Sequence, residues 1–263
     1  MKTLAVQSNQ RRSGEQHGFT LVELMIAVLI ALFLIGGLLT LVQAMKQTSL
    51  NQNGLSQLQD SERMAMTLMT DVIQSTGYFP SPTINTAALS FPIVAPFTFA
   101  GQAIFGTGTF LAAAPGDTLT VRYLTNGTGS PTPDNVINCL GNTSPVAATF
   151  VNTFSVNLAT QTLQCTLTVN GVASAAVPLI SGVESLNIYY GVQTNTGVNT
   201  NSVDAYLDAA TVTAGLYWSN VKTVKIQLTF VNPLFGQQGQ AGVGQFITFT
   251  RIVDVMNKTG VTT

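Results

Sequence analysis

Residues 18–28 form the sequence GFTLVELMIAV, in which a single carboxylate, Glu23, lies at the start of a long apolar run. From Leu24 to Val42 this run contains no charged residue. A helix rises about 1.5 Å per residue, so the run spans roughly the 30 Å hydrocarbon core of a bilayer. We therefore expect one membrane-spanning helix near the amino terminus.

Positive charge lies on one side of this run. Lys2, Arg11 and Arg12 all precede it, and few charges follow closely. Because basic residues favour the cytoplasmic side of a membrane, residues 1–18 are predicted in the cytoplasm and the large remainder outside. We expect a single-pass membrane protein with its large carboxy-terminal domain exported.

Composition argues against several function classes. Charged residues make up 8% of the chain, and no basic stripe follows Gly18, so we expect no nucleic-acid partner. The single histidine, His17, lies in the polar segment that precedes the apolar run. If that segment is removed, no imidazole remains for acid–base catalysis or for a histidine-ligated zinc site. The sequence also lacks a nucleotide-binding loop motif. We expect neither an enzyme nor a bound cofactor or metal.

The order of leader and apolar run is the reverse of an ordinary secretory signal, in which the cleavage site follows the apolar stretch. Here the polar leader ends in Gln16-His17-Gly18, and the apolar run begins at Phe19. This segment resembles the prepilin signature of type IV pilins and type II secretion pseudopilins. The resemblance implies that a prepilin peptidase cleaves between Gly18 and Phe19 and methylates the new Phe19 amine. The apolar helix would be kept.

Glu23 calls for a partner, because a carboxylate in a membrane helix costs about 2 to 3 kcal/mol toward the bilayer centre and less near an interface. Cleavage would place the ammonium group of Phe19 at nearly the same depth. A neighbouring subunit displaced along the axis would offer that amine, and the ion pair would be stronger in an apolar filament core than in water. Glu23 would then set the docking register. The alternative is a hydrated interfacial glutamate.

Beyond residue 45 the helical pattern becomes amphipathic, with apolar residues recurring at steps of three and four. We expect one helix from Phe19 to about Thr76, with residues 19–45 in the membrane and residues 46–77 packed on a sheet. Gly77 is the expected stop. The expected buried positions are Leu55, Leu58, Ala65, Leu68, Met69, Val72 and Ile73.

Residues 78–263 have the signals of an exported β-rich domain. Residues 81–116 lack a clear period and are expected to be irregular, with short strands at most. In residues 222–230 apolar and polar side chains alternate, as in a half-buried strand. The predicted fold is α+β and pilin-like, with an antiparallel sheet packed on the second half of the helix. The expected strands are 118–124, 150–158, 162–169, 183–190, 221–231 and 246–255.

Cys139 and Cys165 are the only cysteines. Export places both in an oxidising compartment, where a disulfide is the default state. The alternative, a two-cysteine metal site, lacks further soft ligands, and the spacing is not that of a redox motif. We expect a disulfide that stabilises the domain by roughly 3 kcal/mol in the chain-entropy model.

One further segment has the composition of a weak calcium loop. Residues 195–204 and Asp208 supply oxygen atoms at alternating positions, but only Asp204 and Asp208 are charged. A solvated Asn- and Thr-rich loop is the preferred explanation. The same two carboxylates are the remaining candidates for a catalytic pair. Trp218 and Tyr189-Tyr190 are expected in the core or at an interface.

Several downstream segments follow one another in a characteristic order. They are residues 117–124, Cys139-Leu140-Gly141, Leu163-Gln164-Cys165, residues 178–191, Val203-Asp204-Ala205-Tyr206 and residues 218–226. In this order they resemble PilW-type minor pilins, and the resemblance covers nearly the whole mature chain. Thr40 stands where many major pilins have a proline, which argues against a major subunit.

The resemblance implies a minor pilin that joins other minor pilins in a priming or tip complex, from which the major pilin polymerises in pilus biogenesis, twitching motility and adhesion. Its expected partners are these subunits, the prepilin peptidase, the inner-membrane assembly platform and membrane lipid. The resemblance implies a single-pass location in the inner membrane with the carboxy-terminal domain in the periplasm, and then the pilus at the cell surface. Two alternatives remain, a J-type minor pseudopilin of type II secretion and a membrane-tethered binding protein or adhesin.

Overall fold

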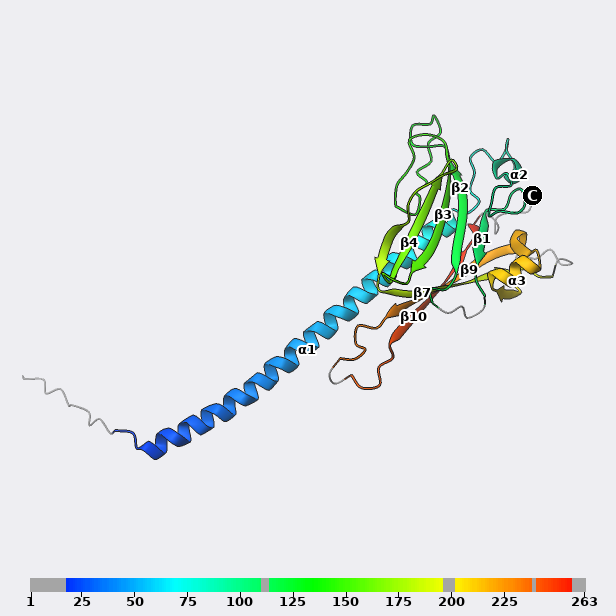
Figure 1. The fold of residues 1–263 in the computed structure, drawn as a ribbon. Helices are drawn as coiled ribbons and strands as arrows, with labels where there is room; N and C mark the ends of the chain where they lie inside the picture. The colour runs from blue at the N-terminus through cyan, green and yellow to red at the C-terminus, as the bar shows by residue number, and fades with distance from the viewer. Residues whose placement is uncertain (1–17, 110–113, 196–201, 238–239, 257–263) are drawn as a thin grey trace, which may run out of the picture. The chain divides into compact units, whose positions relative to one another are not determined.

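The computed structural model describes residues 18–109, 114–195, 202–237 and 240–256 (Figure 1). The chain divides into two compact units, Met1–Asn51 and Gln52–Thr263. The described part of the first unit is almost entirely helix α1 (Leu21–Gln74), which continues into the second unit. The second unit also contains two antiparallel sheets.

Helix α1 begins with a capped first turn. The Thr20 hydroxyl oxygen accepts a hydrogen bond from the Glu23 N–H at 3.3 Å, and T-x-x-E is the spacing of a capping box. An 18-residue window of the helix has a mean hydropathy of 2.9, and none of it is buried. The helix is thus long and apolar enough to cross a membrane, and its side chains need lipid or other helices to cover them.

From residue 52 onward, α1 buries one face in the core of the second unit. The buried residues are Leu58, Ala65, Met66, Met69, Val72 and Ile73. Leu55 and Leu68 are only partly buried, and Met66 is an addition to the predicted face. The helix ends at Gln74. The backbone then turns at Gly77, which has a left-handed φ of +75° and donates its N–H to the Arg122 carbonyl at 2.9 Å.

The strands form two sheets. The first has the order β1-β2-β3-β4-β5, with β6 also paired to β4, and the second has the order β10-β9-β7-β8. The first sheet contains β1 (Ile104–Thr107), β2 (Thr118–Thr125), β3 (Ala148–Asn157), β4 (Thr162–Val169), β5 (Val172–Ala173) and β6 (Val177–Ser181). The second contains β7 (Val183–Val192), β8 (Ala205–Leu207), β9 (Val221–Val231) and β10 (Phe246–Asp254).

The predicted α+β fold is confirmed, and all six predicted strands are present within two residues of their expected ends. The β-domain holds two sheets where one was expected, because the chain leaves the first sheet at Ser181 and enters the second at Val183. Gly182 makes this step with a φ of +78°. The short strand β1 lies within residues 81–116, where short strands were expected at most. The short strands β5, β6 and β8, the helices α2 (Ala87–Ser90) and α3 (Ala209–Ala214), and the 3₁₀ helix η1 (Tyr217–Asn220) were not predicted.

The two sheets meet at β7. One core cluster contains the buried face of α1 and side chains from both sheets. In β3 every second residue is buried, as in a strand with one face on a core. β7 is buried along most of its length, because it pairs with β8 and β9 and also packs against β2, β3 and β4.

Arg122 in β2 is a buried cation, only 3% exposed. Its guanidinium donates hydrogen bonds to the carbonyls of Gln102 at 2.6 Å, Pro92 at 2.8 Å and Phe91 at 3.3 Å. It also lies 4.0 Å from the ring centroid of Phe97 and 5.3 Å from that of Phe91. Burial lowers the pKa of Arg122 to about 10, so it stays charged at neutral pH. Arg122 therefore holds the segment around α2 against strand β2.

Candidate assembly site

The predicted processing junction is exposed at the start of the described chain. Gly18 and Phe19 precede α1, and the Phe19 side chain is 82% exposed. A Cβ added at Gly18 would meet no atom within 4 Å. The folded chain therefore gives no steric reason for a glycine here. A requirement for glycine would come from an enzyme that binds the junction.

Glu23 lies in the first turn of α1, where its backbone N–H is capped by Thr20. A carboxylate at this position also interacts favourably with the helix dipole. Among the described residues the Glu23 carboxylate has no hydrogen-bond or ion-pair partner, and the residue is exposed. The helix dipole favours a carboxylate at this position, and the cap uses only the backbone N–H, so the side-chain charge is available to a cation on another chain.

An apolar groove runs along the second half of α1. Its most exposed apolar side chain is Met64, at 59%. It is lined by Asp60, Arg63, Met64, Thr67, Leu68, Asp71 and Val72 of α1 and by Ile137, Asn138 and Gly141. A second hollow adjoins it at Asp71 and Ile137 and extends to Tyr78 and Met256 beyond the helix end. The groove thus presents apolar surface with charged residues along its helix side.

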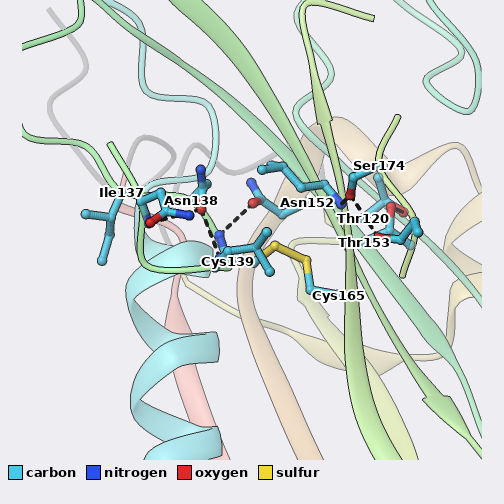
Figure 2. Close-up of a disulfide and its surroundings, with 12 residues drawn as sticks. Thr120, Ile137, Asn138, Cys139, Asn152, Thr153, Cys165 and Ser174 are labelled. Carbon is cyan, nitrogen blue, oxygen red and sulfur yellow. Dashed lines mark hydrogen bonds between the residues drawn. A yellow bond between two sulfur atoms is a disulfide. The ribbon is translucent and has the colours of Figure 1, made fainter. Parts of the chain in front are cut away.

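The loop between β2 and β3 supplies the groove wall that faces α1, and the predicted disulfide holds it in place. Cys139 is bonded to Cys165 of β4, and the bond closes a sequence separation of 26 residues (Figure 2). The Cys139 N–H donates to the side-chain oxygen of Asn152 at 2.8 Å. The hydroxyl of Tyr123 donates to the Ile137 carbonyl at 2.7 Å. The disulfide contributes roughly 3 kcal/mol in the chain-entropy model, and these contacts hold the groove wall in place.

Asp134 anchors the other end of this loop. Its carboxylate accepts hydrogen bonds from the Thr125 hydroxyl, from the Asn126 N–H at 2.8 Å and from the Tyr78 hydroxyl at 3.2 Å. Burial, together with the charge of Asp134, raises the pKa of Tyr78, so the phenol stays protonated and donates. The loop is therefore tied both to the end of β2 and to the segment that follows α1.

Two known families match separate segments of the chain. Residues 15–39 match the prokaryotic N-terminal methylation motif, and residues 149–247 match the model of type IV pilus-assembly protein W. The resemblance to PilW-type minor pilins is confirmed. No curated protein and no solved structure matches the chain.

The two matches cover different parts of the PilW-like chain. The methylation motif includes Gly18, Phe19 and Glu23, and the PilW segment runs from β3 into β10 and includes Cys165. Cys139 and both walls of the groove lie outside the matched segments. The groove is therefore a feature of the structure alone, because no local sequence pattern indicates it.

The carboxylates of the possible calcium loop have structural roles in the PilW-like domain. The Asp204 carboxylate accepts from the N–H groups of Thr194 and Asn195, both at 3.1 Å. Asp208 caps α3 by accepting from the Thr211 N–H at 2.7 Å. Residues 196–201 of this loop lie outside the described residues. Within the described ranges no group of three or more His, Cys, Asp or Glu could hold a metal ion.

The aromatic residues singled out in the sequence lie in the core of the PilW-like domain. Tyr190 and Trp218 are buried, with ring centroids 4.8 Å apart in an edge-to-face arrangement. The Lys225 ammonium lies 4.7 Å from the centroid of the Tyr189 ring. These contacts explain why the aromatic side chains are present without invoking a ligand.

Proposed function

We propose that this chain is a minor pilin that helps to initiate type IV pilus assembly, in a priming or tip complex with other minor pilins. The observation that carries the proposal is the presence in one chain of a prepilin-like methylation motif and a PilW-type segment. The exposed apolar half of α1 supports it, because such a helix needs lipid before assembly and neighbouring helices afterwards. The match to a pilus-assembly protein favours the pilus over a type II secretion filament.

In this proposal the chain crosses the inner membrane once, with its β-domain in the periplasm, and later reaches the pilus at the cell surface. A prepilin peptidase releases the leader at Gly18 and methylates the Phe19 amine. The assembly platform, the other minor pilins and the major pilin are its partners. The role is structural and non-enzymatic, and it supports twitching motility and adhesion through the filament.

Glu23 would provide the docking register. Its charge is unpaired among the described residues, and it lies close in sequence to the amine that cleavage would create at Phe19. A helix cannot easily fold its own terminus back onto a side chain one turn later. A neighbouring chain can bring its Phe19 amine to this Glu23, and removal of one partner of a buried ion pair costs about 3–5 kcal/mol.

The proposal is tested by deleting the gene and complementing the strain with wild-type, Glu23→Ala or Glu23→Gln chains. We expect the deletion to reduce surface pili. Both variants are expected to be cleaved and inserted normally, but to appear in sheared pili at a tenth or less of the wild-type level, on the order of 1.4 kcal/mol or more. The measurement is the ratio of this chain in the pilus fraction to that in the membrane fraction.

Glu23→Gln is the matched control for the cap, because the Thr20 hydroxyl bonds to the backbone of residue 23 and not to its side chain. If charge is what matters, Gln and Ala variants behave alike. Normal incorporation of Glu23→Ala would defeat the ion-pair mechanism, and unchanged piliation of the deletion strain would defeat the priming role.

We further propose that the groove beside α1 receives an apolar segment of another minor pilin. Met64 lies at its edge with most of its side chain exposed, and the opposite wall is held by the disulfide. A rigid apolar surface with a charged margin is typical of the centre and rim of protein interfaces.

A Met64→Arg variant is expected to recover about tenfold less of its minor-pilin partners after cross-linking in membranes, because an unpaired charge would be buried at the interface. The side chain is exposed, so folding should be unaffected. Gln59→Arg is the control, since Gln59 is an exposed residue of the same helix that does not line this groove. Equal recovery from the two variants would rule out the groove as the docking surface.

A further inference from the structure

The junction between the two sheets contains a buried carboxylate. Asp117 directly precedes β2 and is 4% exposed. Its N–H donates to the Leu186 carbonyl at 2.6 Å, and its Oδ2 accepts from the Ile188 N–H at 2.7 Å. Both partners belong to β7. Asp117 lies just before β2 of the first sheet and bonds to β7 of the second. It therefore connects the two sheets through both its backbone and its side chain.

Two polar atoms at this junction are buried without a hydrogen-bond partner among the described residues. They are Oδ1 of Asp117 and the hydroxyl oxygen of Tyr190 in β7. Tyr190 is fully buried. A buried polar atom that lacks a partner costs about 1–3 kcal/mol, so their retention in a tightly packed core calls for an explanation.

Two glycines of the neighbouring backbone pack directly against these two atoms. A Cβ added at Gly108 would lie 1.8 Å from Oδ1 of Asp117, and one added at Gly106 would lie 1.9 Å from the Tyr190 hydroxyl oxygen. The backbone of β1 and of the residue after it therefore lies directly against both oxygens, and a side chain at either glycine would collide with them.

The titratable groups that face Asp117 are Tyr190 from β7 and Asp208 from the start of α3. Asp208 is held on this side because α3 is joined to the end of β1 by the Ala210 N–H, which donates to the Gly108 carbonyl at 3.2 Å. Burial raises the pKa of Asp117 to about 6; the hydrogen bond from Ile188 opposes the shift, and the charge of Asp208 adds to it. Burial and the charge of Asp117 raise the pKa of Tyr190, so its hydroxyl stays protonated.

We propose that Asp117 is a proton-dependent lock between the two sheets, closed when its carboxyl group is neutral and loosened when it is ionised. The proposal concerns the β-domain itself and stands whether or not the chain primes a pilus. A neutral carboxyl group removes the buried charge and keeps Oδ2 as the acceptor for Ile188. Ionisation leaves a negative charge in the junction beside the charge of Asp208.

The direction of the pH dependence follows from the two pKa values. The carboxyl group has its ordinary value of 3.8 in the unfolded chain and a value of about 6 in the folded one. The folded state therefore binds the proton more tightly, and stability from this group is complete below the unfolded value and is lost as pH rises through the folded value. From about pH 5 to about pH 7.5, the unfolding constant of the junction should rise on the order of tenfold.

The chain contains a natural reporter of this junction. Trp218 is its only tryptophan, and the indole packs edge-to-face on Tyr190 at 4.8 Å. We would record Trp218 fluorescence of the full chain in detergent micelles between about pH 5 and pH 7.5, together with hydrogen-exchange protection factors for residues 186–188. We expect a fluorescence change with a midpoint near the folded pKa of about 6, and about tenfold lower protection at the upper end.

Two variants test the assignment. Asp117→Asn keeps a carbonyl oxygen for the Ile188 N–H and cannot ionise, so both signals should become independent of pH. Asp208→Asn keeps a good helix cap but removes the neighbouring charge, so the midpoint should move to lower pH. Asp254→Asn, at an exposed position in β10, should behave as wild type.

An Asp117→Asn chain with the wild-type pH profile would overturn the lock. Should that variant fail to fold, Asp208→Asn still decides the question, because an unmoved midpoint would show that the titrating group does not lie in this junction. A midpoint that moves equally in Asp254→Asn would overturn it as well.

Discussion

A Gly18→Val variant is expected to remain at its full length in the membrane and to be absent from filaments. Gly18 is exposed and a Cβ there would meet no atom within 4 Å, so the substitution should not disturb the fold. A prepilin peptidase that holds the backbone closely at this residue would be blocked by the added side chain. The uncut chain would keep the cationic leader and would offer no amine at Phe19 to a neighbouring Glu23.

The intact mass of the purified chain measures this outcome, since cleavage after Gly18 would remove 18 residues. Gly14→Val is the matched control, because Gly14 lies in the same leader but away from the junction. It should be processed as wild type. Cleavage of Gly18→Val at the normal rate would place the processing site elsewhere.

An Arg122→Met variant is expected to lose much of its stability although the disulfide stays intact. Methionine fills a similar volume but leaves the carbonyls of Gln102 and Pro92 without their donor. The Phe91 carbonyl keeps the hydrogen bond from the Gly101 N–H at 2.8 Å. Each buried acceptor left unpaired costs about 1–3 kcal/mol, so we expect a loss of roughly 3 kcal/mol or more. In a domain of this size that corresponds to a fall in Tm of about 6–12 °C.

Thermal unfolding followed by circular dichroism measures this loss. Arg251→Met is the control, because Arg251 is exposed and its hydrogen bond to Thr70 is long, at 3.4 Å; it should change stability by less than about 0.5 kcal/mol. Arg122→Lys should fall between the two, since an ammonium group cannot reproduce the planar fork of donors. Equal Tm values for Arg122→Met and Arg251→Met would refute the anchoring role.

The sequence predicted elements whose signal is local. Residues 222–230 alternate in polarity and form most of β9, and the apolar run from Leu24 to Val42 lies within α1. The division into two sheets was not predictable in this way, because alternation shows which face of a strand is buried but not which strand lies beside it. Strands of two to five residues, such as β5 and β6, are too short to show a period.

The candidate sites also divide into those with a local sequence signal and those that depend on contacts between distant parts of the chain. Gly18, Phe19 and Glu23 belong to one continuous motif, and the capping spacing of Thr20 and Glu23 is visible in the same stretch. In the sequence Asp117 stands out only as the first residue of a segment that resembles the family, and nothing local indicates that it is buried. Its burial depends on Ile188, which is 71 residues away in the chain. The groove likewise depends on a loop placed by a disulfide and by Tyr123, far from α1 in sequence.

The bond between Cys139 and Cys165 also has a mechanical consequence. If a filament is under tension, a subunit in it bears the force between its amino-terminal helix and the partner or surface that its β-domain binds. An extended chain reaches about 3.5 Å per residue, so a bond that closes a separation of 26 residues withholds roughly 90 Å of contour length from stretching. With the bond intact, force can pass through the two sulfur atoms directly into β4. With it reduced, the same force would act along the intervening segment, which contains β3, and this segment could extend only after β3 had separated from β2 and β4.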